Sequence, residues 1–311
     1  MKILVTGGAG FIGSHVVKAY IEQGHDVVVV DNLSSGIQER IHPKAKFYFM
    51  DIRSKELNRV FDLERPDVVN HHAAQKSVPK SVEDPMYDAE YNVMGLLNIL
   101  ECARTYGVKK FIFVSSGGAL GGDAAQIPTP ETVQPVMISP YAIHKYIGEK
   151  YLHFYRVTYG LHYTVLRYAN VYGPNQIADG ECGVIPIFMN NLVEGRPSIL
   201  FAYADQPKGT TRDYVYVHDV AKANVLALTK GDDQVLNIGT GTEVHTEDVY
   251  HLIADVLGSD IPLQRASERV GDVRRSVLDC TRAKEVLGWQ PTTSLEEGIR
   301  QTLAWLEQQA R

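Results

Sequence analysis

The sequence predicts an α/β fold with a doubly wound parallel sheet and a smaller C-terminal α/β lobe. Short apolar, β-branched runs alternate with helix-length amphipathic segments through the first half of the chain, a pattern typical of doubly wound sheets. The apolar runs are continuous, which indicates strands buried on both faces and therefore parallel pairing with right-handed crossovers. The chain has 311 residues, 44% of them hydrophobic, enough for one large α/β unit or two domains.

The expected elements alternate along the chain. Strand-like runs occupy residues 2–6, 26–30, 46–50, 67–72, 110–115 and 163–168, with helical patterns at about 11–23, 54–64, 88–106 and 141–159. After about residue 173, Pro, Gly and Asn punctuate the chain and the elements become shorter. We therefore expect one domain over 1–172 and a smaller lobe over 173–311, with 212–239 returning in part to the main sheet.

Composition excludes several classes of protein. The formal net charge is −6, and no run of like charges suggests a nucleic-acid surface. The three cysteines are far apart in the sequence, which indicates a reduced protein with neither a disulfide framework nor a Cys metal cluster. The apolar start KILVTG is too short for a signal peptide, and no apolar run reaches the ~18 residues of a membrane span. A cytoplasmic location follows as an expectation.

A glycine-rich turn, TGGAGFIG at 6–13, follows the first strand and opens a helix. Gly7, Gly10 and Gly13 permit the tight turn and the close approach of a diphosphate to the free N–H groups of the helix N-terminus. Asp31 ends the second strand, where a carboxylate accepts the ribose hydroxyls and repels a 2′-phosphate. The sequence therefore predicts a Rossmann-like domain that binds NAD rather than NADP.

Two adjacent histidines, in HHAAQ at the end of the fourth strand, raise the question of a metal site. Adjacent strand residues point to opposite faces, so His71 and His72 cannot easily share a metal, and we predict no metal site. The small residues Ala73 and Ala74 instead suit backbone that passes close to a cofactor.

Tyr141 and Lys145 form a YxxxK pair after the helix-start signal Ser139-Pro140. They lie one turn apart on one helix face. A lysine ammonium beside a phenol, near a positive nicotinamide ring, is expected to lower the tyrosine pKa toward neutrality. The phenolate could then take a proton from a sugar hydroxyl as hydride leaves the same carbon.

Taken together, TGGAGFIG, Asp31, HHAAQ, the serines at 115–116, YAIHK, RYANVYGP, RDYVYVHD and RVGD occur in a familiar order. The chain resembles the extended short-chain dehydrogenases/reductases, and most closely the UDP-glucose (UDP-galactose) 4-epimerases. The resemblance spans nearly all of the chain. It implies tightly bound NAD, a UDP-hexose substrate and a homodimer formed through the helices near 88–106 and 141–159, whose spare apolar faces could build a four-helix bundle.

The resemblance also implies roles for matching residues. Tyr141 corresponds to the catalytic base and Lys145 to its partner, while Asn170, Arg212 and Arg269 correspond to residues that hold the substrate diphosphate, for which guanidinium forks are well suited. Further implied cofactor contacts are Phe11, Ile12, Asn32, Asp51, Ile52, Gln75, Asn92, Ser115 and Tyr168. Further implied substrate contacts are Pro186 and Phe188 at the uracil pocket, Tyr214, Asp272, and Ser276 as the gate beside the hexose.

One departure concerns SSGGALGG at 115–122. The family usually has Ser or Thr where this chain has Gly117, and Tyr where it has Gly121. We therefore expect Ser116, or a water, to replace the missing hydroxyl, with Tyr141 as the principal acid/base.

The predicted reaction is reversible 4-epimerisation of UDP-glucose and UDP-galactose through a 4-keto sugar. Because serine is small at position 276, N-acetylated UDP-hexosamines are also expected substrates. A nucleotide-sugar 4,6-dehydratase is disfavoured because Gly118-Ala119 replaces the Asp-Glu usual there. A UDP-glucuronate epimerase or decarboxylase, and a non-catalytic NAD-binding protein, remain alternatives.

Overall fold

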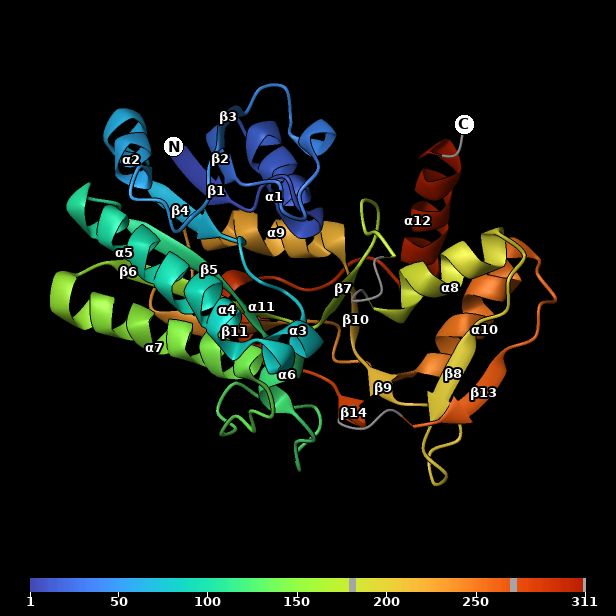
Figure 1. Cartoon of the computed structure of the whole chain (residues 1–311). Helices are drawn as coiled ribbons and strands as arrows, with labels where there is room; N and C mark the ends of the chain where they lie inside the picture. Colours follow the sequence, from blue (N-terminus) through green and yellow to red (C-terminus); the bar gives the residue numbers. More distant parts are fainter. Residues whose placement is uncertain (179–182, 269–272, 310–311) are drawn as a thin grey trace.

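The computed structural model describes residues 1–178, 183–268 and 273–309. A large lobe surrounds a seven-stranded sheet in the order β11-β6-β5-β4-β1-β2-β3, and a smaller lobe lies beside it (Figure 1). All neighbouring strands of this sheet are parallel. The strands are β1 (Lys2–Thr6), β2 (Asp26–Asp31), β3 (Lys46–Phe49), β4 (Val68–His71), β5 (Lys110–Ser116), β6 (His162–Tyr168) and β11 (Gln234–Ile238). The predicted fold class is confirmed.

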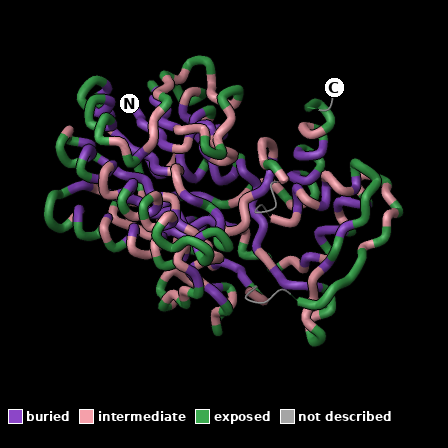
Figure 2. The backbone as a smooth tube through the Cα atoms, in the orientation of Figure 1, coloured by how far each residue is buried: buried purple, intermediate pink, exposed green. Residues whose placement is uncertain are grey.

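Helices cover both faces of the sheet. On one face lie α1 (Phe11–Glu22), α9 (Val217–Ala227) and α11 (Thr281–Leu287), and on the other α2 (Leu57–Glu64), α5 (Leu96–Thr105) and α7 (Pro140–Tyr159). Within β1, Ile3 and Val5 join the first core while Leu4 joins the second. Side chains thus alternate between two apolar layers, which explains why the strands read as continuous apolar runs. Figure 2 shows the buried trace concentrated in this sheet.

The helix expected over 88–106 is more complex than the pattern suggests. It follows α3 (Val78–Glu83) and runs as α4 (Pro85–Ala89), a π-helical segment η2 (Glu90–Gly95) and then α5. By contrast, α7 begins as its sequence signal predicts. Ser139 Oγ accepts a hydrogen bond from Ala142 N at 3.2 Å, and Pro140 occupies the first turn. A short helix, α6 (Gly117–Gly121), follows β5 directly, and η1 (Gln38–Arg40) lies after β2.

The smaller lobe packs three helices around its own core: α8 (Val184–Val193), α10 (Thr246–Leu257) and α12 (Leu295–Gln309). Its strands are short: β7 (Asn170–Tyr172) pairs with β10 (Tyr214–Tyr216), β9 (Thr211–Arg212) lies between β12 (Val244–His245) and β14 (Arg275–Ser276), and β8 (Ile199–Ala202) pairs with β13 (Gln264–Ser267).

The chain passes between the lobes several times. Residues 212–239 contribute α9 and β11 to the large lobe, and α11 packs there as well. The lobes are therefore spatial units rather than two consecutive stretches of sequence. Among the described residues, no helix is both long enough and apolar enough to cross a membrane.

Candidate active site

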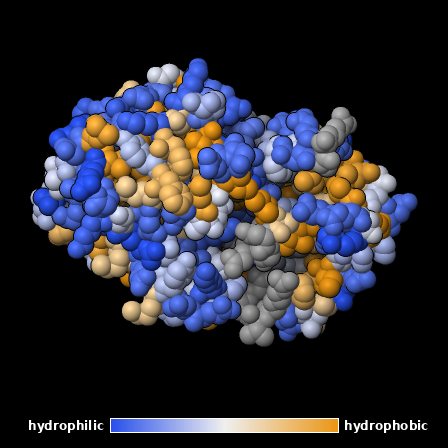
Figure 3. All heavy atoms as spheres, turned by 45° about the horizontal axis from the view of Figure 1, so that its top comes forward, coloured by the Kyte–Doolittle hydropathy of each residue, from blue (hydrophilic) through white to orange (hydrophobic). Residues whose placement is uncertain are grey.

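The carboxyl ends of the sheet strands open into a cavity of about 390 Å³. Doubly wound sheets bind ligands at this edge. The predicted site residues that line it are Gly7, Gly10, Phe11, Ile12, Gly13, Asp31, Asn32, Ile52, Ala73, Ala74, Ser115, Ser116, Tyr141, Lys145, Tyr168, Asn170, Pro186 and Tyr214. On the face seen in Figure 3, apolar side chains gather where the two lobes meet.

Six predicted residues do not line the cavity: Asp51, Gln75, Asn92, Phe188, Arg212 and Ser276. Arg269 and Asp272 lie outside the described residues.

The glycine-rich loop is shaped for a diphosphate. Gly7 has φ +70°, and a β-carbon there would lie 2.7 Å from Ala73 N; a β-carbon on Gly13 would lie 2.1 Å from Gly7 O. Neither position tolerates a side chain. Gly10 caps α1 without a side-chain hydrogen bond, so N–H groups at this helix end are available to an anion. The residues present therefore fit a dinucleotide.

Asp31 is buried at the end of β2 and is held by the loops around it. Its Oδ2 accepts from Ala9 N at 3.0 Å and its Oδ1 from Leu33 N at 2.8 Å. Each carboxylate oxygen has two acceptor sites, so both still have capacity for a ribose hydroxyl.

The two histidines differ in their surroundings. His71 contacts Thr6 Oγ1 through Nδ1 at 2.7 Å and stacks on Phe113, whereas His72 lines the cavity near Tyr168. No group of three or more His, Cys, Asp or Glu side chains suited to a metal occurs among the described residues.

Gln75 and Asn92 form a buried network behind the cavity instead of lining it. Asp88 Oδ1 accepts from Gln75 Nε2 at 2.6 Å and from Asn92 Nδ2 at 3.0 Å, and its Oδ2 contacts His144 Nδ1 at 2.5 Å. Both side chains bind Asp88 in this structure, and their contact with the cofactor stays a prediction.

The acid/base group lies where β5 meets α7. Lys145 Nζ donates to Val114 O at 3.0 Å and lies 5.8 Å from the centroid of the Tyr141 ring. Burial lowers the pKa of Lys145 to about 8, although Asp88 opposes this. Burial also raises the pKa of Tyr141 to about 12, while its interaction with Ser116 pulls the other way. The chain alone therefore does not depress the pKa of Tyr141 as expected, because desolvation outweighs its polar neighbours.

The two serines at the end of β5 have different partners. Ser115 Oγ donates to Glu149 Oε1 at 2.8 Å, and Glu149 is paired with Arg167. Ser116 interacts with Tyr141, and its Oγ accepts from Ala119 N at 3.3 Å as the cap of α6. Ser116 is thus the serine hydroxyl beside the acid/base group.

The glycines of α6 face different surroundings. A β-carbon on Gly117 would lie 2.4 Å from Leu278 Cδ1, so a hydroxyl at this position would point into the core. A β-carbon on Gly118 would lie 3.2 Å from Ser276 Oγ and 4.0 Å from Asn170 Oδ1. Ser276 is therefore close to the cavity-lining Asn170, even though it does not line the cavity itself.

The two residues of α8 that are predicted to contact the substrate face in different directions. Pro186 lines the cavity, but Phe188 is buried against Tyr250 with ring centroids 5.3 Å apart. Two helical positions are separated by about 200°, which explains why both cannot face one pocket. Arg212 Nη1 donates to Thr211 O at 2.8 Å, and its β9 position pairs with Ser276 of β14.

The chain matches the model of the NAD dependent epimerase/dehydratase family over residues 3–239. The chain belongs to this family. The resemblance seen in the sequence is thereby confirmed.

Three solved structures cover this chain almost completely. The UDP-glucose 4-epimerase of Thermotoga maritima, with UDP-glucose, has a TM-score of 0.96 at 50% identity and covers 100% of both chains. The UDP-glucose 4-epimerase of Thermus thermophilus, with NAD, has 0.92 at 43%, covering 99% of each. The UDP-N-acetylglucosamine 4-epimerase of Methanobrevibacter ruminantium, with UDP-N-acetylmuramic acid, has 0.93 at 33%, covering 99% of this chain and 98% of that one.

The family match, together with relatives at 43–50% identity that are named UDP-glucose 4-epimerases, makes this chain an NAD-dependent enzyme of the epimerase (isomerase) class. Several cavity-lining residues were not predicted: Arg40, Lys76, Tyr91, Asn175, Gln176 and Ile177. Lys76 directly follows HHAAQ, and Asn175 directly follows RYANVYGP, so extending the family motifs by one residue would have found both. Arg40 and Tyr91 have no such local signal.

Replacing Gly117 should be costly and replacing Gly121 should not. The β-carbon of Gly117→Ala would collide with the buried Leu278, whereas that of Gly121→Ala meets nothing within 4 Å. We expect Gly117→Ala to lower the free energy of unfolding by ~1–3 kcal/mol, and Gly121→Ala to leave it within about 0.5 kcal/mol. Urea unfolding of the two variants tests this. Equal stability would show that Leu278 gives way.

Ser116→Ala should lower turnover by ~10–1000-fold, because a polar group beside the reacting oxygen is lost. Ser115→Ala is the matched control and should do less, because its hydroxyl is committed to Glu149. Steady-state kinetics on both variants, with NAD content measured alongside, checks the prediction. Unchanged turnover in Ser116→Ala would assign the role to a water or to Tyr141 alone.

Proposed function

We propose that this enzyme interconverts UDP-glucose and UDP-galactose by inverting C4 of the hexose. The observation that carries the proposal is the placement of Tyr141, with Ser116 and Lys145, in the same cavity as the glycine-rich dinucleotide loop. An acid/base group within reach of a dinucleotide site suits a reaction that moves a proton and a hydride together. The solved relative from Thermotoga maritima, at 50% identity, is named for this reaction.

A carbinol C–H is not acidic, so inversion at C4 requires oxidation and re-reduction through a 4-keto sugar. Tyr141 removes the O4 proton in the forward half and returns it in the reverse half. The chemistry supplied by NAD at this site is acceptance and return of the C4 hydride. Because burial holds the pKa of Tyr141 at about 12, proton removal depends on positive charge nearby. Lys145 provides part of that charge, and a nicotinamide cation is expected to provide the rest.

The hexose must turn over between the two half-reactions, so we place the anchors on the nucleotide. Asn170, Pro186 and Tyr214 line the substrate side of the cavity, and Asn170 is the proposed contact of the diphosphate. Arg212 lies on β9 beside Ser276, and we propose that it joins Asn170 when the nucleotide is bound. We propose that Gly118 and Ser276, which lie close to the cavity-lining Asn170, face the sugar, where their small side chains leave room for rotation.

A dehydratase would need an additional acid/base pair to eliminate water. At the positions after β5 where such residues would act, this chain has Gly118 and Ala119, neither of which can transfer a proton. The geometry therefore supports the redox-neutral epimerase over the dehydratase.

We also propose that N-acetylated UDP-hexosamines are substrates. Ser276 Oγ lies 3.2 Å from the β-carbon position of Gly118. Serine and glycine are among the smallest residues, so we propose that an acetamido group fits beside them. The relative from Methanobrevibacter ruminantium, at 33% identity, is named a UDP-N-acetylglucosamine 4-epimerase.

A homodimer is proposed from an apolar surface on the large lobe. Val82 of α3, Met86 of α4, Met94 of η2, and Ile143 and Val157 of α7 are exposed. These helices include the segments expected to form an intermolecular four-helix bundle, and burying such side chains would stabilise a dimer.

Purified enzyme incubated with UDP-galactose should produce UDP-glucose, and Tyr141→Phe should lower this turnover by ~10²–10⁴-fold, because the proton-transfer group is removed. The variant should retain NAD, since the ring is preserved. Product is measured by chromatography and cofactor by release on denaturation. If the variant kept more than about a tenth of the activity, the base would have to be another group.

Ser276→Tyr should abolish turnover of UDP-N-acetylglucosamine and spare UDP-galactose, because a phenol beside Gly118 would fill the space an acetamido group needs. The ratio of kcat/KM for the two substrates is the measurement, and Ser276→Ala is the control that keeps the space open. No turnover of the N-acetyl substrate by the wild type would mean that another part of the wall closes the pocket.

A further inference from the structure

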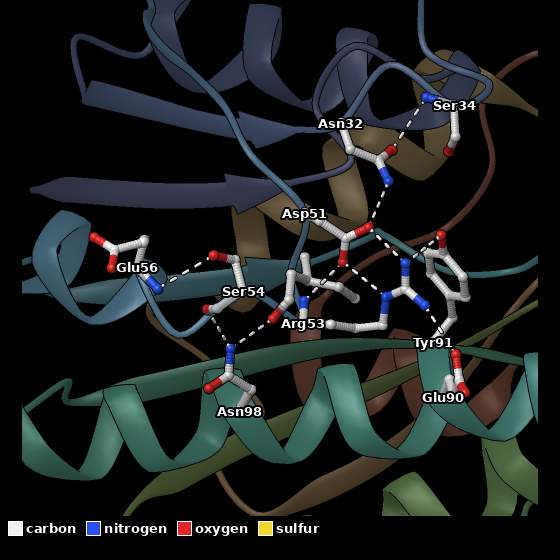
Figure 4. Close-up of polar contacts among 10 residues, drawn as sticks. Asn32, Ser34, Asp51, Arg53, Ser54, Glu56, Glu90, Tyr91 and Asn98 are labelled. Atoms are coloured by element: carbon white, nitrogen blue, oxygen red, sulfur yellow. Dashed lines mark hydrogen bonds and ion pairs between the residues drawn. The ribbon is translucent and has the colours of Figure 1, made fainter.

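Three segments meet at the end of the cavity beyond Asp31. They are the loop after β2, which carries Asn32, the residues after β3, which carry Asp51 and Arg53, and η2, which carries Tyr91 (Figure 4). Asn32, Ile52 and Tyr91 line the cavity. In a doubly wound sheet, the segment beyond the ribose-binding carboxylate lies beside the adenine. This end of the cavity is therefore the adenine end.

Asp51 is fully occupied by donors from the protein. Its Oδ1 accepts from Arg53 N at 2.8 Å and from Arg53 Nε at 3.0 Å. Its Oδ2 accepts from Arg53 Nη2 at 3.0 Å and from Asn32 Nδ2 at 2.9 Å. These four donors fill the roughly four acceptor sites of a carboxylate. The carboxylate thus binds protein groups in this structure, and the contact of Asp51 with the cofactor stays a prediction.

Each of the three guanidinium nitrogens of Arg53 donates at least one hydrogen bond. Besides the fork to Asp51, Nη1 donates to Glu90 Oε2 at 3.0 Å and Nη2 donates to the Tyr91 hydroxyl at 2.7 Å. The guanidinium carbon lies 3.7 Å from the centroid of the Tyr91 ring, and Tyr87 contacts that ring at 4.8 Å. A planar fork that also stacks is specific to arginine.

We propose that Arg53 is a positioning residue for the adenine half of NAD. It does not line the cavity, so it acts through two lining residues: it contacts Tyr91 directly and holds Asn32 through Asp51. These contacts join the segments after β2 and β3 to η2 in one preformed wall. A wall ordered before the ligand arrives costs less to bind and slows ligand release. The inference rests on the NAD dependence of the family, and not on the UDP-hexose substrate proposed above.

Retention has a chemical purpose in an enzyme that ends each cycle with its cofactor unchanged. Release of reduced cofactor after the first half-reaction would leave the sugar oxidised and the protein unable to complete the turnover. A cavity wall that is already ordered by contacts within the chain slows the release of the cofactor before the second half-reaction.

The test measures release of bound NAD from purified enzyme, using a chase with excess isotopically labelled NAD. Arg53→Gln should release NAD ~10–100-fold faster than wild type, because charged hydrogen bonds of this kind are lost. Arg53→Lys should behave almost like Arg53→Gln, because an ammonium cannot reproduce both the fork and the stack. Tyr91→Leu should also release NAD faster, and Tyr91→Phe, which keeps the stack, should be affected less.

Arg59→Gln is the matched control. It removes an arginine from the neighbouring α2, where Arg59 is exposed and paired with Glu56, and it should release NAD at the wild-type rate. The second readout is turnover: Arg53→Gln should regain wild-type turnover at saturating NAD, which a purely structural defect would not do. Wild-type release from Arg53→Gln, equally fast release from Arg59→Gln, or failure of NAD to restore turnover would overturn the proposal. The release rate is independent of any sugar assay.

Discussion

The site depends on one steric constraint, the contact between the glycine-rich loop and the end of β4. Gly7 lies so close to Ala73 that no β-carbon fits between them, and Gly13 lies closer still to Gly7. This contact brings the N-terminus of α1 against the carboxyl edge of the sheet, which presents free N–H groups where a diphosphate can bind. Because β4 lies next to β5 in the sheet, the glycine-rich loop and Ser116 lie at the same edge of the sheet and line one cavity with Tyr141.

Burial, rather than any ion pair, dominates the chemistry at the other end of the cavity. It raises the pKa of Tyr141 and lowers that of Lys145, so in the chain alone the phenol is protonated at neutral pH. The chain supplies position and exclusion of water, and the reaction requires additional positive charge before the phenol can act as a base. An acid/base group that is weak without its cofactor is protected from unproductive proton transfer.

The sequence predicts the sheet well because its central strands are buried on both faces, and a continuous apolar run of this length is compatible with few other structures. Side-chain direction in irregular segments is harder to predict. Asp51, Gln75 and Asn92 match family positions, and in the structure their side chains bind Arg53 and Asp88. Arg53 lies only two residues from Asp51, and Asp88 only four residues from Asn92, but hydrophobic periodicity does not indicate which polar side chains pair in a turn or an irregular helix. Phe188 illustrates the same limit on a helix, where a two-residue step reverses the direction.

The missing hydroxyl of SSGGALGG follows from packing. At Gly117 a side chain would enter the space of Leu278, so a serine here could not reach the cavity without displacing a core residue. The hydroxyl of Ser116, one residue earlier on β5, is the one that meets Tyr141. At Gly118, one residue later, a β-carbon would lie 3.2 Å from Ser276 Oγ, closer than side chains normally pack. Glycine at both positions therefore lets one short helix pack against Leu278 while leaving room for the hexose that, in the proposed reaction, must turn over beside it.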